Sequence, residues 1–462
     1  MKKQNTVAFF NILSTVLLRG LSIFTAPLFS RLLGDSGYGV VSIYLVWVGV
    51  LQIIFTFQSH GSLVNARIEY PDEKQKAYQS SAMTLSMLMY LGCTAVVLLF
   101  LDPISQLLRM DRILVILILI QAFAGFATLF LNAKFTYEFR ADLNCLISVG
   151  VAVLTLVLSL LFIWWMPEGQ EHFGRILALV LANGVFGYAA CIYVLLSGRT
   201  FYNKEYWKFC LTLSLPLVFY SLSDLLLGQS DRVMLQHMLS EATVGQYSLA
   251  YNFAGIIFTI FGALNNTWVP FFFEDMKQGR RQPMMAQAKN FLELYTVLSA
   301  GFVLLTTEVY HIFASREFWA GTLLIPVFVV GYYFNFLCTF PINYEYYRKK
   351  TKVVAIVTVA AAVFNVGLNY VLIKNMGLVG ATLATAVSHG IQFAMHYLYV
   401  RYKLGREDYP FGLKVWLPYP LAFAAVLAVV YLLPDAALIR WGLGIAIGGW
   451  EAYRILKRKV LM

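Results

Sequence analysis

Long apolar segments separated by short polar breaks follow one another along the whole chain. A helix needs about 20 mainly apolar residues to cross a bilayer, and the backbone of such a segment must satisfy its own hydrogen bonds, which favours helices over isolated strands. The pattern therefore predicts an all-α polytopic membrane protein. We count fourteen predicted spans, at 7–33, 38–59, 79–101, 112–132, 144–166, 174–196, 209–230, 244–270, 288–313, 318–341, 353–373, 377–400, 413–433 and 438–455.

Composition agrees with this class. Of the 462 residues, 60% are hydrophobic and 13% are charged, whereas soluble domains are about 45–50% apolar and about 25% charged. Arg19 interrupts the first apolar run and no small-x-small cleavage site follows it, so we expect an uncleaved first span rather than a signal peptide. The loops are too short for a catalytic domain outside the membrane.

Basic residues outnumber acidic ones, 35 to 24, which gives a net charge of +11. With a cytoplasmic N-terminus, 26 basic residues fall on the inside and eight on the outside. This bias is what the positive-inside rule describes, so we predict that both termini are cytoplasmic. The net charge then reflects topology and contact with anionic membrane lipids, and it does not indicate nucleic acid binding.

Two parts of the sequence repeat each other at an offset of 206 residues. The segment "RLLGDSGYGVVSIYLVW", which begins at 31, aligns with "HMLSEATVGQYSLAYNF", which begins at 237. The alignment pairs Asp35 with Glu241 and Gly39 with Gly245. At an offset of 207, "TYEF" (136–139) aligns with "NYEY" (343–346). Chance similarity among helices rich in Gly, Leu and Ser is the alternative explanation.

The repeat predicts two six-helix lobes, 1–198 and 199–404, followed by two additional helices in 405–462. Both lobes begin on the same side of the membrane, so their symmetry axis would run along the membrane normal. Transporters of this kind place the substrate between the two halves and move one half against the other.

Charged residues inside the spans are candidates for function. Arg19 lies near the middle of the first span, where a charge costs about 2.5–3.5 kcal/mol on insertion scales. Asp224 lies at nearly the same depth in the seventh span. We expect both to line a central cavity, with Arg19 facing an anionic substrate and Asp224 as its ion-pair partner or a protonatable coupling group. A structural pair that joins two helices is the alternative.

Polar residues on three further spans extend the predicted cavity. Asn252 and Asn266 share a face of the eighth span, and Asn365 and Asn369 are four residues apart in the eleventh. His389 lies at mid-depth in the twelfth, where an imidazole could carry a proton. The alternative is hydrogen bonding between packed helices, which small and polar residues commonly provide in lipid.

Nucleotide- and metal-binding motifs are absent from the sequence. It contains no P-loop, no zinc-protease helix, no Cys-x-x-Cys and no Gly-x-Ser-x-Gly elbow. We therefore expect no cofactor, no metal, no catalytic residues and no enzymatic activity.

The strings "RLLGDSGYG", "SDRVMLQHMLSEATVGQYSLAY" and "GLVGATLAT" occur in an order and spacing that extends over nearly the whole chain. In these strings and their order, the chain resembles the polysaccharide flippase family of the multidrug/oligosaccharidyl-lipid/polysaccharide exporter superfamily. The motif positions of this resemblance are Gly34, Tyr38, Gly39, Asp231, Arg232 and Gly245.

The resemblance implies a flippase of the bacterial cytoplasmic (inner) membrane. It would move an undecaprenyl-diphosphate-linked oligosaccharide to the outer leaflet by alternating access, for O-antigen, capsule or exopolysaccharide. Arg19 would face the diphosphate, a proton or sodium ion could drive the cycle, and polysaccharide polymerase or assembly proteins would be partners. The alternatives are a cation-coupled multidrug or small-solute antiporter of the same fold, and a membrane glycan polymerase, ligase or acyltransferase, which would favour a long external loop.

Overall fold

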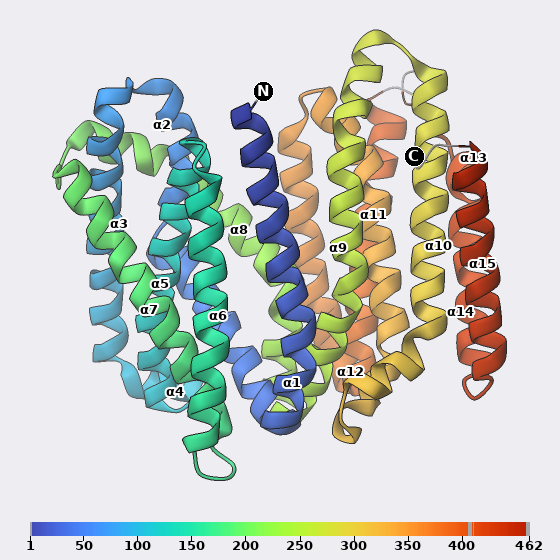
Figure 1. The fold of residues 1–462 in the computed structure, drawn as a ribbon, viewed down its shortest axis with the longest axis horizontal. Coiled ribbons are helices and arrows are strands. Elements are labelled where there is room, and N and C mark those ends of the chain that lie inside the picture. The colour runs from blue at the N-terminus through green and yellow to red at the C-terminus, as the bar shows by residue number, and fades with distance from the viewer. Residues whose placement is uncertain (1, 405–408, 410, 459–462) are drawn as a thin grey trace. The chain divides into compact units, whose positions relative to one another are not determined.

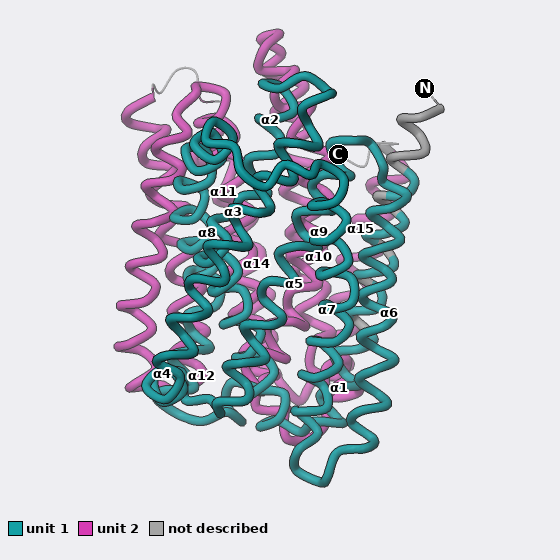
Figure 2. The backbone as a smooth tube through the Cα atoms, turned by 90° about the vertical axis from the view of Figure 1, so that its left-hand side faces the viewer, with its two compact units in different colours: residues 1–245 teal, residues 246–462 magenta. Residues whose placement is uncertain are grey.

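The computed structural model describes residues 2–404, 409 and 411–458. The side chains of 2–8, 11, 12, 16, 19, 23 and 458 lie outside this description. Every regular element in the described residues is a helix (Figure 1). The chain forms two compact units, Met1–Gly245 and Gln246–Met462, which are coloured separately in Figure 2. The repeat-based lobe boundary at 198 stays a prediction.

Unit 1 holds eight α-helices, a 3₁₀ turn and the beginning of a ninth helix. In chain order these elements are α1 (Lys2–Phe55), η1 (Ser59–Ser62), α2 (Leu63–Glu69), α3 (Asp72–Leu99), α4 (Leu101–Leu108), α5 (Arg112–Tyr137), α6 (Ala141–Trp165), α7 (Glu171–Gly198), α8 (Lys204–Met238) and α9 (Glu241–Gln278). Within this unit the N-terminus and α2 lie at one end, and α4, the α6–α7 connection and the bend of α1 lie at the other (Figure 1). The predicted topology makes this second end the outer one.

Unit 2 contains the rest of α9 and the elements that follow. These are α10 (Arg281–Phe313), η2 (Arg316–Leu323), α11 (Ile325–Tyr347), α12 (Thr351–Lys403), α13 (Leu413–Trp416), α14 (Pro418–Leu432) and α15 (Ala437–Arg458). α11 packs along α12, while α10 packs against α14 and α15.

Eleven helices in the described part of the chain are long and apolar enough to cross a membrane. Two of them, α1 and α12, contain one non-helical glycine each, Gly34 and Gly377, and both glycines lie at the boundary between two predicted spans. Gly34 has φ 64° and ψ 178°, a conformation that costs a side-chain-bearing residue strain. The multi-pass helical class is therefore confirmed, and the total of fourteen crossings stays a prediction.

The surface of α15 shows which solvent the helices face. Most of its exposed side chains are apolar, such as Leu438 at 90% and Ile445 at 72% exposure, whereas Arg440 and Arg454 are buried against α10. Arg440 forms an ion pair with Glu308. Arg454 forms an ion pair with Glu293 of α10 (2.9 Å). A helix that buries its charges and exposes apolar side chains is suited to lipid, because a charge exposed to hydrocarbon is costly.

Candidate functional site

The two repeated segments contact each other within unit 1. A Cβ atom added to Gly39 would lie 1.9 Å from the carbonyl oxygen of Glu241, and one added to Gly245 would lie 1.9 Å from that of Asp35. The contact is reciprocal. Each glycine approaches the acidic residue of the other motif, and the 206-residue offset pairs these two acidic residues with each other. Two equal segments related by a two-fold axis produce this pattern. Both glycines are therefore needed for close approach of the α1 and α9 backbones.

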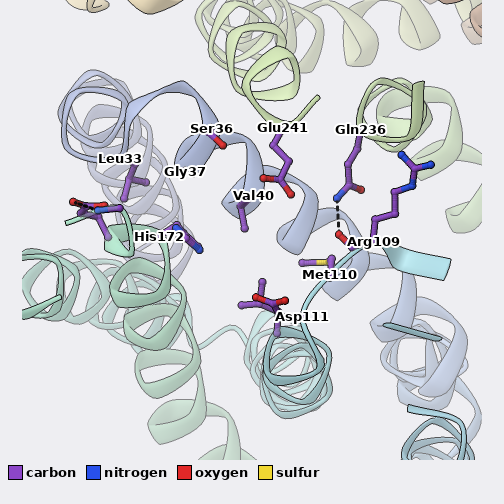
Figure 3. Close-up of a pocket in the computed structure, with 13 residues that line it drawn as sticks. Leu33, Ser36, Gly37, Val40, Arg109, Met110, Asp111, His172, Gln236 and Glu241 are labelled. Atoms are coloured by element: carbon purple, nitrogen blue, oxygen red, sulfur yellow. Dashed lines mark hydrogen bonds between the residues drawn. The ribbon is translucent and has the colours of Figure 1, made fainter. Parts of the chain in front are cut away.

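A cavity of about 500 Å³ lies beside this crossing, at the end of unit 1 where α1 bends. Four parts of the unit form its walls: α1 next to Gly34, the α4–α5 connection, the α6–α7 connection and the α8–α9 junction (Figure 3). The lining residues are Leu33, Ser36, Gly37, Val40, Arg109, Met110, Asp111, Leu114, Gly169, Glu171, His172, Gln236 and Glu241.

Carboxylates dominate the charge of the cavity. Asp111, Glu171 and Glu241 all line it, and none of the three forms an ion pair with an Arg or Lys of the described residues. Ser36 lines the cavity beside Glu241 (Figure 3). The Glu171 carboxylate accepts a hydrogen bond from a backbone N–H of its own loop (3.0 Å). The lining is thus acidic and rich in hydrogen-bond acceptors.

The basic residue on the wall, Arg109, is engaged elsewhere. Its guanidinium donates to the carbonyl oxygen of His237 (3.0 Å). In return, the Gln236 amide donates to the carbonyl of Arg109 (3.2 Å), and a ring nitrogen of His237 lies 3.0 Å from the carbonyl of Leu107. An Arg at the carboxyl end of α8 also complements the helix dipole. We call these four residues the α8 latch, because they join the end of α8 to the α4–α5 connection.

No feature of the sequence indicated the α8 latch. Its members occupy two predicted loops, and the two sides of the latch are about 130 residues apart along the chain. The motif residues Asp231 and Arg232, by contrast, are buried in α8 just before the latch. The Asp231 carboxylate accepts from the backbone N–H of Arg232 (2.8 Å), and the Arg232 guanidinium donates to Gln229 (3.1 Å).

The predicted intramembrane acid, Asp224, lies apart from this cavity. Asp224 is exposed on α8 and is not part of the lining. Arg19 is on the first half of α1, and its side chain lies outside the described residues. The roles of both residues stay predictions.

The predicted asparagines fall into two groups in unit 2. Asn252 and Asn266 are exposed on α9, whereas Asn365 and Asn369 are buried in α12. The Asn365 amide donates to the Ser388 hydroxyl across the bend of α12 (3.2 Å). The Asn369 amide donates to Asn365 (2.9 Å). Both hydrogen bonds join residues of α12 itself, and the cavity role of the pair stays a prediction.

His389 is also on α12 and is 9% exposed. One of its ring nitrogens lies 3.4 Å from the Gln392 side-chain oxygen. A role for His389 in carrying a proton stays a prediction.

Two further ionisable pairs with a buried member, one in each unit, were not predicted. In unit 1, Lys134 is 2% exposed, contacts Glu138 at 2.9 Å and also donates to Gln79. In unit 2, Glu345 and His396 are fully buried, with the His396 Nδ1 atom 3.0 Å from both carboxylate oxygens. Glu138 and Glu345 are the residues that the 207-residue offset pairs. The repeat therefore keeps the glutamate and changes its partner.

A family model described as "Polysaccharide biosynthesis protein" matches residues 6–276, which is more than half of the chain. The chain belongs to this family. The match includes both repeated motifs and every residue that lines the cavity.

Two proteins of Haemophilus influenzae are similar to this chain. An uncharacterized membrane protein of Haemophilus influenzae is 24% identical over 357 residues, which cover 74% of this chain and 83% of that protein. "Lsg locus putative protein 1" of the same organism is 25% identical over 54% of this chain and 61% of its own length.

Solved structures show the same fold. The lipid II flippase MurJ, in an inward closed conformation, matches with a TM-score of 0.74 and 16% identity, over 98% of this chain and all of that chain. An inward-facing multidrug resistance MATE family transporter of the MOP superfamily matches with a TM-score of 0.61 and 14% identity, over 89% and 95% of the two chains. This chain is therefore a multi-pass membrane protein with the fold of MOP superfamily transporters.

Proposed function

We propose that the protein is a flippase that moves undecaprenyl-diphosphate-linked oligosaccharide units across the bacterial inner membrane for surface polysaccharide synthesis. Both termini would be cytoplasmic, the mechanism would be alternating access, and a proton or sodium gradient could supply the energy. It would act as a transporter and not as an enzyme, next to the polymerase or assembly proteins that use its product.

The observation that carries this proposal is the family match over the segment in which the two repeated motifs pack reciprocally. A polysaccharide biosynthesis family and a fold shared with MurJ together favour a lipid-linked glycan as the substrate. A central site between repeats is the usual arrangement of transporters built this way.

Arg19 is the residue that we expect to bind the substrate diphosphate. It is the basic residue placed mid-way in a predicted span, and an intramembrane charge is retained at a cost only where it serves the fold or the substrate. Asp224 would neutralise it in the empty transporter or take up a coupling ion. Asn252, Asn266, Asn365, Asn369 and His389 remain the proposed polar surroundings.

Deletion of the gene tests the function directly. We expect lipid-linked repeat units to accumulate in the inner leaflet and surface polysaccharide to fall. Arg19→Ala at normal expression should fail to complement the deletion, whereas Arg19→Lys should retain part of the activity because it keeps the charge. Unchanged surface glycan without accumulation would refute the proposal, and full complementation by Arg19→Ala would refute the role of Arg19.

A cation-coupled multidrug antiporter is the second candidate. The structural match to a MATE transporter and the exposed acidic Asp224 favour it. Efflux of a cationic dye by the purified protein in liposomes, lost in Asp224→Asn and unaffected in Arg19→Ala, would support this function over the flippase.

A further inference from the structure

We propose that the acidic cavity of unit 1 is a saccharide-binding site, which holds the glycan of the substrate apart from its diphosphate. This inference rests on the proposed function, because it assigns the two chemically different parts of one substrate to two places. All of the lining residues belong to unit 1, so the site is complete within that unit.

The charge of the cavity selects against a phosphate group. Three carboxylates line it without an Arg or Lys ion-pair partner in the described residues, and the guanidinium of Arg109 is held by His237. Like charges brought close together repel, and a ligand of the same sign adds to that repulsion. A diphosphate would meet this repulsion, whereas a neutral or amino sugar would not.

The hydrogen-bonding groups fit a sugar. A glycan presents many hydroxyl donors, and the Glu241, Asp111 and Glu171 carboxylates are acceptors. Figure 3 shows the Glu241 and Gln236 side chains extending from one side of the cavity and Asp111 on the opposite side. Gln236 is 5% exposed, and its side-chain oxygen has no hydrogen-bond partner in the described part of the chain. A buried amide oxygen of this kind gains from a hydroxyl donor, because leaving it unpaired carries a desolvation cost.

The size and the apolar part of the lining support the same ligand class. A volume of about 500 Å³ falls within the range of small-molecule sites, which is about 300–1,000 Å³. Leu33, Val40 and Met110 provide contact for the apolar faces of a sugar ring. A metal ion is a poor alternative, since the described residues contain no group of three His, Cys, Asp or Glu side chains that could hold one.

The site also lies where a conformational change would alter it. One wall is the part of α1 that follows the bend at Gly34, and another is the first residue of α9, which packs on α1 at the Gly39–Gly245 crossing. Any change in that crossing moves Ser36 relative to Glu241. Bound glycan would therefore stabilise one arrangement of α1 and α9 over others.

Binding to the purified full-length protein in lipid nanodiscs tests the inference. The probe is the free oligosaccharide released by mild acid from the lipid-linked material of the deletion strain, which carries no lipid and no diphosphate. Glu241→Gln and Asp111→Asn keep the size of the side chain and should each weaken binding by about tenfold, which corresponds to about 1.4 kcal/mol. The matched control is Glu168→Gln, an exposed carboxylate of the same α6–α7 connection outside the lining, and it should bind as the wild type does.

Two competitors distinguish the ligand classes. Inorganic pyrophosphate and spermidine should not displace the glycan. Equal binding by the wild type and by both lining variants would overturn the inference, and so would competitive displacement by pyrophosphate or by spermidine. If a carboxylate variant does not fold, Ser36→Ala provides the second test, because it removes a lining hydroxyl beside Glu241 and should weaken binding several-fold.

The two proposals can fail separately. If the deletion strain accumulates lipid-linked glycan and the lining variants bind it normally, the flippase proposal stands and the saccharide site is wrong. If the deletion strain accumulates no lipid-linked glycan, the flippase proposal is wrong and the saccharide site falls with it.

Discussion

The glycine crossing allows one structural prediction to be worked through in detail. Replacing Gly39 by Ala places a methyl group 1.9 Å from the Glu241 carbonyl oxygen, and Cβ contacts below 3.0 Å are essentially never found. The α1 and α9 backbones must therefore separate by roughly 1 Å. Overpacking of this kind costs about 1–3 kcal/mol. Alanine returns up to about 1 kcal/mol through its higher helix propensity, so we expect a net loss of up to about 2 kcal/mol.

Thermal unfolding in detergent measures this loss, with Tm falling by about 2–4 °C for each kcal/mol in a unit of this size. The matched control is Gly92→Ala in α3, where an added Cβ meets nothing within 4 Å and should raise stability slightly. The reasoning also predicts non-additivity. Gly39→Ala and Gly245→Ala strain the same crossing, and one separation relieves both, so the double variant should lose less than the sum of the single losses.

Two results would refute this account of the crossing. The first is a Gly39→Ala variant that behaves like Gly92→Ala, since the helices would then not be in close contact. The second is strict additivity of Gly39→Ala and Gly245→Ala, because it would mean that the two glycines serve separate contacts.

Three further predictions concern other parts of the chain. Arg109→Gln removes the donor to the His237 carbonyl and should lower the free energy of unfolding by about 1 kcal/mol, while Arg112→Gln, whose ion pair with Asp102 is exposed, should change it by less than about 1 kcal/mol; equal losses in chemical denaturation would contradict a role for the α8 latch. Arg440→Met leaves the partly buried Glu308 without its cation and should cost about 3–5 kcal/mol, largely restored in Arg440→Met/Glu308→Leu; a double variant no more stable than the single one would argue against the ion pair as the cause. Burial lowers the pKa of His60, which follows the end of α1, so its imidazole is neutral in the fold and takes up a proton on unfolding below about pH 6.5; the stability from neutral His60 is thus present above that pH and lost as the pH falls, and Tm should drop less between pH 7.5 and 5.5 in His60→Gln than in the wild type, with identical profiles as the contrary result.

Hydropathy predicted the helical membrane class because each crossing is a local property of about 20 residues. The repeat also identified Gly39 and Gly245, and the bend at Gly34 lies in a predicted break. These features depend on composition and on short motifs. They could therefore be found without knowledge of which helices are neighbours.

The lining of the cavity could not be predicted in this way. Asp111, Glu171 and Gln236 lie in or next to short connections that hydropathy treats only as gaps, and the fold brings them together from three distant positions. Buried ion-pair partners could not be predicted either. His396 and Glu345 are 51 residues apart, and no periodicity indicates that their side chains meet. The polar stripes of the spans were visible, but helix packing and substrate binding use the same residue types.

The reciprocal crossing also bears on how the two repeated segments can diverge. Each glycine lies against the backbone of the other motif. A larger residue at either glycine would therefore clash with the other segment unless that segment also changed. Drift in either copy is therefore constrained by the other, and compensation would require paired substitutions. The two copies should stay similar in sequence at this point after the surrounding helices have diverged. This is where the offset of 206 residues is still detectable.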